Sequence, residues 1–466
     1  MPTQSARRIR NGIQNKIQSF DRAGHDWYRF VLSFPPHLVR KYLEEFELNP
    51  SHQVLDPFCG TGTTLVECKK HGIPSVGIEA NPLLHFASRI KTDWSPDPNR
   101  LLAHAQRIAE LTIRELDASG INDDPNFFHK RNGSKNHLRT LSPEHAKLLL
   151  KNSISPLPLH KTLVLLDMLK RHRHAGYEGH EQLALARALV FDISNLHFGP
   201  EVGLGSLKKD ARVIGAWLDC LNSMVHDLRD LEGLQRVPSV AYCEDARNIR
   251  TVLEPHSVDA VITSPPYPNE KDYTRTTRLE SVLLGFVNDK LELRSLKKEL
   301  IRSNTRGVYS TDDDDQWILG HPEITNIAER IEARRIHLGK TSGFERLYAR
   351  VTKLYFGGMA KHLAELRPVL KPGARLAYVV GDQASYLRVM IRTGQILSDI
   401  AQTLGYVPLK IDLFRTRLST VTKEQLREEV IVLQWPGKAA HNRVGFACEK
   451  FSDYSKRGHR RKRGKR

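Results

Sequence analysis

The chain of 466 residues is long enough to bury a large core and to hold more than one domain. Its 40% hydrophobic and 27% charged residues are typical of a soluble globular protein, and no apolar run reaches the roughly 20 residues that span a bilayer. The net charge of +18 predicts a polyanionic partner, for which nucleic acid is the simplest choice. The five cysteines form no CxxC pair, which argues against a disulfide framework or a zinc ribbon and predicts a cytoplasmic protein.

Both ends of the chain are predicted to be basic segments outside the folded core. Residues 1–26 form a polar, Arg-bearing arm, and residues 443–466 form a tail. Eight of the last twelve residues, 455–466, are Lys or Arg, with no acid among them. Such a segment binds phosphate without reading base sequence.

The first strand is predicted to lead into a glycine turn. After a helix that begins near Pro36, the pair Val54-Leu55 runs into Asp56-Pro57-Phe58-Cys59-Gly60-Thr61-Gly62. Glycines let a backbone approach a ligand closely. No Lys follows them, so this is not a phosphate loop, and the third glycine of the dinucleotide fingerprint is missing. The carboxylate of Asp56 suits a cationic or amino-bearing ligand.

A second strand over residues 75–79 ends in Glu79, 17 residues after Gly62. An acid at the tip of the second strand of a βαβ unit commonly binds ribose hydroxyls. The residues from 97 to 236 then turn helical and basic. The tetrapeptide Arg171-His172-Arg173-His174 has no acid or Cys at ligand spacing beside it, so no metal site is expected there.

A third strand is predicted over 241–247, with Asp245 near its end, and a fourth over 258–262. The fourth runs into Thr263-Ser264-Pro265-Pro266-Tyr267, where two prolines end the strand because neither can donate to a ladder. Residues 285–345 are again helical and basic, and the acidic run Asp312–Asp315 is expected to be a loop.

Further strands are predicted at 375–382, 407–414 and 429–434, with helices at 346–366 and 388–404 between them. Strands separated by helices indicate a parallel α/β sheet. Ligands bind such a sheet at the carboxyl ends of its strands, so the tips at Asp56, Glu79, Asp245 and Ser264 are expected to share one site.

These motifs resemble the S-adenosylmethionine-dependent methyltransferases that methylate exocyclic amino groups in DNA, above all the cytosine-N4 members. The run Asp56 to Gly62 resembles their cofactor motif, and Ser264-Pro265-Pro266-Tyr267 resembles their catalytic motif. Phe34-Pro35-Pro36-His37-Leu38-Val39 is similar to the segment before the cofactor motif in unpermuted members. The resemblance covers about half of the chain and leaves both helical stretches unmatched. It implies a Rossmann-like class I methyltransferase fold with a mostly parallel, seven-stranded sheet and large helical insertions.

The resemblance also implies the domain organisation and the partners. A catalytic domain is expected to consist of residues 27–96, 237–284 and 346–442, interrupted by insertions at 97–236 and 285–345. The stretch 268–345 leaves a strand tip directly beside Ser264 and is expected to lie over the reaction face, while the stretch 97–236 reaches the same cleft or only flanks it. The expected partners are double-stranded DNA and, as a candidate, a cognate restriction endonuclease, with no membrane.

The same resemblance implies a role for each matched residue. Asp56 would hold the methionine amino group of S-adenosylmethionine, with the Gly60 and Gly62 backbone passing beneath it. Glu79 would bind the ribose hydroxyls, and Asp245 would accept from the adenine amino group. Three more residues are expected in the cofactor site: Phe34, Phe58 and Ala246.

The chemistry expected at Ser264-Pro265-Pro266-Tyr267 follows from the weak nucleophilicity of a base amine, whose lone pair is delocalised into the ring. Acceptors for both N–H bonds, the Ser264 Oγ and the Pro265 carbonyl, would pull the nitrogen towards tetrahedral geometry. Tyr267 would stack on the base once it leaves the helix, which offsets part of the few kcal/mol that flipping costs. No covalent intermediate is needed, since positioning and electrostatics carry the reaction.

Ser264, rather than Asp or Asn, favours cytosine N4 over adenine N6. Adenine-N6 methylation, guanosine-N2 methylation of RNA, and a non-catalytic nucleic-acid-binding protein with the same fold remain alternatives. Methylation at cytosine C5 is rejected, because it needs a thiolate that usually follows a proline, and no Cys here does. The expected function is site-specific DNA methylation in restriction-modification or host defence.

Overall fold

The computed structural model describes residues 21–28, 33–124, 138–198, 202–269, 271–418 and 425–438. Of the predicted basic arm it describes only residues 21–26, and the predicted tail at 443–466 lies outside the described residues. Within these ranges, no helix has the length and apolar character that a membrane crossing requires.

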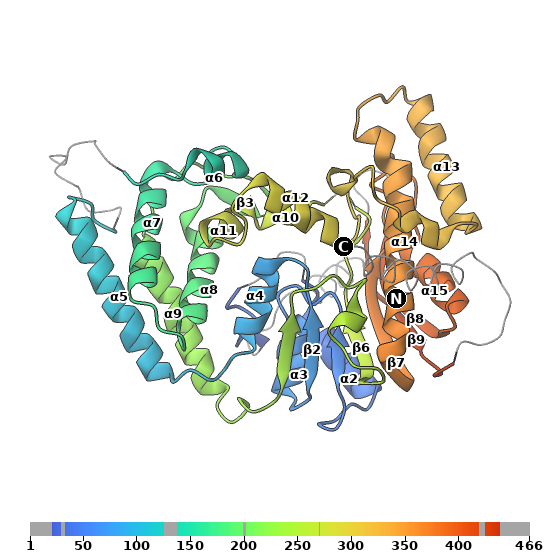
Figure 1. Cartoon of the computed structure of the whole chain (residues 1–466), viewed down its shortest axis with the longest axis horizontal. Coiled ribbons are helices and arrows are strands. Elements are labelled where there is room, and N and C mark those ends of the chain that lie inside the picture. Colours follow the sequence, from blue (N-terminus) through green and yellow to red (C-terminus); the bar gives the residue numbers. More distant parts are fainter. Residues whose placement is uncertain are drawn as a thin grey trace, which may run out of the picture.

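A seven-stranded sheet with the order β5-β2-β1-β6-β7-β9-β8 lies at the centre of the molecule (Figure 1). Its strands are β1 (Val54–Asp56), β2 (Ser75–Ile78), β5 (Ser239–Tyr242), β6 (Val258–Thr263), β7 (Leu370–Gly381), β8 (Val407–Leu418) and β9 (Gln425–Gln434). The first five in this order run parallel, and β9 is antiparallel to both of its neighbours. The predicted α/β fold with a mostly parallel, seven-stranded sheet is therefore confirmed, and it is consistent with a Rossmann-like methyltransferase fold.

Helices cover both faces of the sheet, because its central strands are apolar on both sides. In β6, Ala260 and Ile262 pack into the core that holds α2, whereas Val261 packs into the core that holds α14 and α15. The helices of these two layers are α2 (Pro36–Glu45), α3 (Thr63–Lys70), α14 (Tyr348–Leu366) and α15 (Thr393–Thr403). The central strands are thus buried from both faces, so a ligand can reach them only at their ends.

A helical lobe lies to one side of the sheet and has a core of its own, which continues into α4 (Pro82–Lys91). It contains α5 (Pro98–Ala118), α6 (Pro143–Leu148), α7 (Pro156–Arg171), α8 (Glu178–Ala188) with the π-helical turn Leu189–Ile193, and α9 (Val213–Asp230). Trp217 of α9 is fully buried in that core, and its indole nitrogen donates to the Glu181 carbonyl. A small antiparallel pair, β3 (Leu196–Phe198) and β4 (Val202–Leu204), interrupts the helical pattern.

The second insertion lies above the carboxyl ends of the parallel strands (Figure 1). Its helices are α12 (Lys290–Glu299) and α13 (Pro322–His337), and the short helices α10 (Tyr273–Thr276) and α11 (Arg278–Leu283) lead into it from β6. Short 3-10 turns at Ile249–Thr251, Thr305–Gly307, Asp314–Ile318, Glu345–Leu347 and Arg367–Val369 complete the described helical segments. This insertion, and not the helical lobe, is placed to cover the tips of the strands.

Two details correct the sequence predictions. The third strand ends at Tyr242, so Asp245 lies in a turn beyond it, where its Oδ1 accepts from the backbone N–H of Arg247 at 2.9 Å. The acidic run at 312–315 is not a plain loop, because Asp314 begins a 3-10 turn and is buried. Its carboxylate pairs with the buried Arg247 guanidinium, a partner far away in sequence.

Candidate active site

One cavity of about 590 Å³ opens at the carboxyl ends of β1, β2 and β6. This volume is within the range of small-molecule and cofactor sites, which is about 300–1,000 Å³. Its wall consists of the turn after β1, the end of β2, the segment after β6, residues 297–304 of the second insertion, and parts of β8 and β9. Ten of the predicted site residues line it: Phe34, Phe58, Gly60, Glu79, Asp245, Ala246, Ser264, Pro265, Pro266 and Tyr267.

The remaining two, Asp56 and Gly62, do not line the cavity. The Asp56 carboxylate is fully buried and accepts from the Thr263 hydroxyl at 2.6 Å, the Thr64 hydroxyl at 2.7 Å and the Phe58 backbone N–H at 3.1 Å. Burial raises the pKa of Asp56 to about 6, and these hydrogen bonds oppose that rise. Both carboxylate oxygens are bonded within the protein, so Asp56 ties the turn after β1 to the end of β6.

Glycine is required at the two positions of the turn for different structural reasons. Gly60 has φ +50° and an added Cβ would meet nothing within 4 Å, so its backbone borders open space in the cavity wall. Gly62 has φ +82°, and an added Cβ would lie 3.0 Å from the Cβ of Ser88. Gly60 therefore permits the approach of a ligand, whereas Gly62 permits the packing of α3 against α4.

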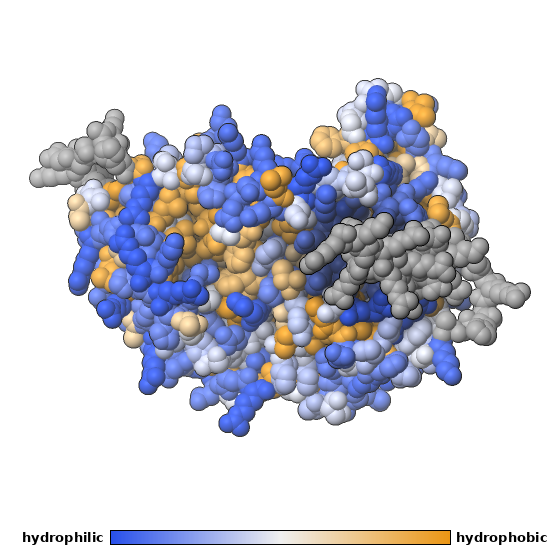
Figure 2. Space-filling model, viewed as in Figure 1, coloured by the Kyte–Doolittle hydropathy of each residue, from blue (hydrophilic) through white to orange (hydrophobic). Residues whose placement is uncertain are grey.

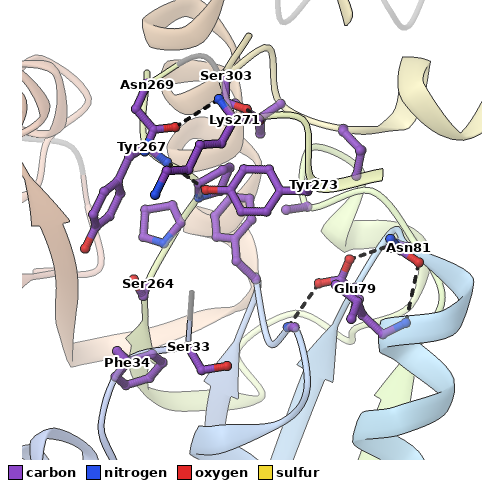
Figure 3. A pocket seen from close by; sticks show the side chains of 18 of the residues that line it. Ser33, Phe34, Glu79, Asn81, Ser264, Tyr267, Asn269, Lys271, Tyr273 and Ser303 are labelled. Carbon is purple, nitrogen blue, oxygen red and sulfur yellow. Dashed lines mark hydrogen bonds between the residues drawn. The ribbon is translucent and has the colours of Figure 1, made fainter. Parts of the chain in front are cut away.

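Glu79 is held by the two segments that border it (Figure 3). One carboxylate oxygen accepts from the Gly60 backbone N–H at 3.0 Å, and the other accepts from the Asn81 backbone N–H at 2.7 Å. Burial raises the pKa of Glu79 to about 7, which the backbone bonds only partly offset. Each oxygen keeps a further lone pair for hydroxyl donors.

Ser264 lies on the other side of the cavity from Glu79, below Tyr267 and Lys271 (Figure 3). Its hydroxyl donates to the Val379 carbonyl of β7 at 3.2 Å, so the lone pairs of Oγ are left for other donors. The Tyr267 backbone N–H donates to the Tyr273 hydroxyl at 3.4 Å, and the Tyr267 ring packs over Gly381, where a Cβ would lie only 3.0 Å from it. The two prolines predict a rigid turn, and contacts with β7 and with α10 hold this turn in place.

Asp245 forms a buried cluster with Arg247. The guanidinium of Arg247 contacts both carboxylate oxygens of Asp245 at 2.6–3.0 Å, and it also pairs with Asp314. The same guanidinium donates to the carbonyls of Lys298 and Glu299 at the end of α12, at 3.1 and 3.2 Å. One buried cation therefore joins the turn beyond β5 to the second insertion.

Several cavity residues were missed by sequence reasoning. They are Lys271, Asp272 and Tyr273 after Ser264-Pro265-Pro266-Tyr267, Lys297, Arg302 and Asn304 from the second insertion, and Arg415, Arg417 and Glu428 from β8 and β9. The first three lie four to six residues after Tyr267, and this closeness in sequence was the available signal. The others come close to Ser264 only through long-range folding, so no local pattern marks them.

The comparisons with known proteins agree with this geometry. Residues 11–86, which include the turn from Asp56 to Gly62 and also Glu79, match the N6_N4_Mtase family model, described as a DNA methylase. The similarity is to N6/N4 DNA methylases. Over about nine-tenths of the chain the similarity is distant, because only about one residue in four is identical to those of type II methyltransferases.

Three such relatives cover most of the chain. Type II methyltransferase M.BsoBI of Geobacillus stearothermophilus is 25% identical over 91% of this chain and 87% of its own length. Type II methyltransferase M.AvaI of Nostoc sp. is 24% identical over 92% of this chain and 91% of its own. Type II methyltransferase M.MvaI of Kocuria varians is 23% identical over 81% and 80%. The similarity to the first two thus extends well beyond the cofactor motif, through both insertions.

Proposed function

We propose that this protein transfers a methyl group from S-adenosylmethionine to the exocyclic N4 amine of cytosine in double-stranded DNA. The observation that supports this most directly is the position of Ser264, whose Oγ donates to Val379 and borders the same cavity as Gly60 and Glu79. The similarity to type II methyltransferases further supports a role in restriction-modification, with a cognate restriction endonuclease as the partner enzyme.

The residues present fit the cofactor. Open space at Gly60 and the second lone pairs of the Glu79 carboxylate would hold the ribose, and Phe34, Phe58, Asp245 and Ala246 line the same cavity. When bound, S-adenosylmethionine supplies an electrophilic methyl carbon on a sulfonium. Asp56 has its oxygens bonded to Thr64, Thr263 and Phe58, so we assign it to positioning the turn and not to the methionine amino group.

The target amine would be held by two acceptors. Because the Ser264 hydroxyl donates to Val379, its Oγ is oriented to accept one amine N–H, and the Pro265 carbonyl accepts the other. The nitrogen lone pair is then withdrawn from the ring and would form the new N–C bond while the methyl–sulfur bond breaks and its electron pair returns to sulfur as a neutral thioether, after which the nitrogen loses one proton to solvent. Tyr267, which packs over Gly381, is placed to stack on the flipped base.

The two insertions would contact the DNA in different ways. Residues 297–304 of the second insertion line the cavity, so the segment 285–345 would contact DNA around the target base. No residue from 97–236 is among those that line the cavity in the described part of the chain, so the helical lobe would flank the duplex. The catalytic domain would comprise 27–96, 237–284 and 346–442.

The product identifies the reaction. Purified protein, S-adenosylmethionine and double-stranded DNA should give N4-methylcytosine when the digested DNA is analysed by mass spectrometry. N6-methyladenine as the only product would overturn the choice of base, and methylation of RNA but not DNA would overturn the choice of substrate. Absence of cofactor binding in calorimetry would overturn the assignment as an enzyme of this class.

Cofactor affinity should rise with pH around neutrality. The pKa of Glu79 in the folded chain is raised to about 7, so the carboxylate is largely protonated at pH 6 and largely ionised at pH 8. Only the ionised form accepts from two ribose hydroxyls, so the dissociation constant should fall by about tenfold over this interval, as a single titration with that pKa requires. Calorimetry with wild type and Glu79→Gln over this pH range isolates the effect, since the variant lacks this titration. Parallel pH profiles for the two proteins would contradict the prediction.

A further inference from the structure

Helix α12 has one side in the cavity wall and another side in solvent. Lys297 and Glu299 at its end line the cavity, whereas Arg294 and Lys298 are exposed. These two cations lie one helical turn apart, so they project from the same face of the helix. The hollow between α12 and α14 has hydrophilic side chains around it (Figure 2). Lys298 therefore lies between two residues of the cavity wall in the sequence, and Arg294 lies one helical turn before it.

Both cations converge on one aromatic ring. The Arg294 guanidinium lies 5.3 Å and the Lys298 ammonium 5.7 Å from the centre of the half-buried Tyr309 ring. The Arg302 guanidinium is also close to this ring, at 5.8 Å, but its charge is neutralised by Asp312 at 2.8 Å. Neither Arg294 nor Lys298 forms an ion pair with a carboxylate in the described part of the chain. Two positive charges without a carboxylate partner among the described residues thus lie beside the Tyr309 ring.

Hydrogen bonds fix the Tyr309 backbone and the end of α12. The Tyr309 backbone N–H donates to the Asp312 carboxylate at 2.7 Å, and the Tyr309 carbonyl accepts from Arg350 of α14 at 3.2 Å. The end of α12 is fixed by the Arg247 guanidinium, which bonds to the carbonyls of Lys298 and Glu299. Buried ion pairs therefore tie the ring and the helix to the frame of the catalytic site.

We propose that Arg294, Lys298 and Tyr309, here called the basic platform, bind the phosphodiester backbone beside the nucleotide that enters the cavity. This inference rests on the proposed function, and it assigns these three residues to binding of the target DNA strand. Like charges crowded on one face repel each other unless an anion joins them, and exposed Lys and Arg are the usual ligands of nucleic-acid phosphates. The Tyr309 ring holds both cations in place and offers an apolar face to the neighbouring sugar or base.

The experiment compares two double variants that remove the same charge. Arg294→Ala/Lys298→Ala removes the platform cations. Arg236→Ala/Lys438→Ala removes two exposed cations at the opposite edge of the sheet, since Arg236 precedes parallel strand β5 and Lys438 follows antiparallel strand β9. The affinity of each protein for a 30-base-pair duplex of mixed sequence is measured by fluorescence anisotropy at several salt concentrations, and cofactor affinity is measured by calorimetry.

Each lost phosphate contact should reduce the slope of log affinity against log salt concentration by about 0.9, so the platform variant should lose about 1.8. Its DNA affinity should fall at least tenfold at low salt, with cofactor affinity and melting temperature unchanged. The control variant should keep the wild-type slope. An equal slope in wild type and platform variant would overturn the inference, and so would an equal loss in both variants. If wild type bound the cofactor but no DNA, the proposed function would fail instead. Retained affinity for DNA with a loss confined to RNA would likewise overturn the inference.

Discussion

Ser264→Ala is expected to lower the rate of methyl transfer by about 10²–10³, the usual cost of removing one group that stabilises charge in a transition state. Ser264 directly follows β6, its hydroxyl donates to the Val379 carbonyl, and the residue lines the cavity. Alanine leaves one N–H of the target amine without an acceptor when positive charge develops on the nitrogen. A single-turnover assay with radiolabelled cofactor and saturating DNA measures this step apart from binding.

Ser385→Ala provides the matched control, because Ser385 also lines the cavity and is exposed. Its rate should stay within about threefold of wild type, in line with a hydroxyl outside the reaction. Loss of the Ser264–Val379 hydrogen bond should cost only about 1 kcal/mol of folding free energy, which a melting curve can check. A Ser264→Ala protein with a wild-type rate would refute the catalytic assignment.

Glu79→Ala is expected to weaken cofactor binding by about 10²–10⁴-fold. The reason is that two hydrogen bonds from ribose hydroxyls to a carboxylate contribute about 1.5–3 kcal/mol each, and every 1.4 kcal/mol is a factor of ten. The carboxylate also accepts from the backbone N–H groups of Gly60 and Asn81, so its removal loosens the turn that borders the cavity. Calorimetric titration with S-adenosylmethionine gives the dissociation constant directly.

The comparison protein is Glu299→Ala, which removes another carboxylate from the cavity wall. We expect its dissociation constant to change by less than about threefold, because Glu299 comes from α12 and not from the βαβ unit that we propose to bind the ribose. Similar losses in both variants would indicate that net charge, and not the position of Glu79, governs affinity. Circular dichroism of each variant separates this result from misfolding.

The local elements of the catalytic frame were predictable because each depends on neighbouring residues. Apolar runs such as 258–262 predict buried strands, and the two prolines after Ser264 end β6. The glycine turn after β1 and the acid after β2 follow from spacing within one βαβ unit. Ten of the predicted site residues consequently meet at one cavity.

Residues that depend on distant partners were not predictable in the same way. The acidic run at 312–315 has the composition of a loop, but Asp314 neutralises Arg247, which lies 67 positions earlier in the chain. Asp56 was expected to face the ligand, yet hydroxyls from Thr64 and Thr263 bind its oxygens once β1 and β6 pair. In both cases the decisive contact exists only after separate segments have packed.

The sequence by itself therefore determined the ends of β1, β2 and β6, the glycine turn and the Ser-Pro-Pro-Tyr motif, since hydrophobic periodicity and turn chemistry act over a few residues. Only the tertiary structure decided that Lys297, Arg302 and Asn304 of the second insertion line the cavity, and that the Asp56 carboxylate is bonded within the protein. It alone showed that Arg294 and Lys298 converge on Tyr309. The physical reason is that burial and charge pairing depend on which segments become neighbours, and a buried cation such as Arg247 is stable only where folding brings carboxylates to it.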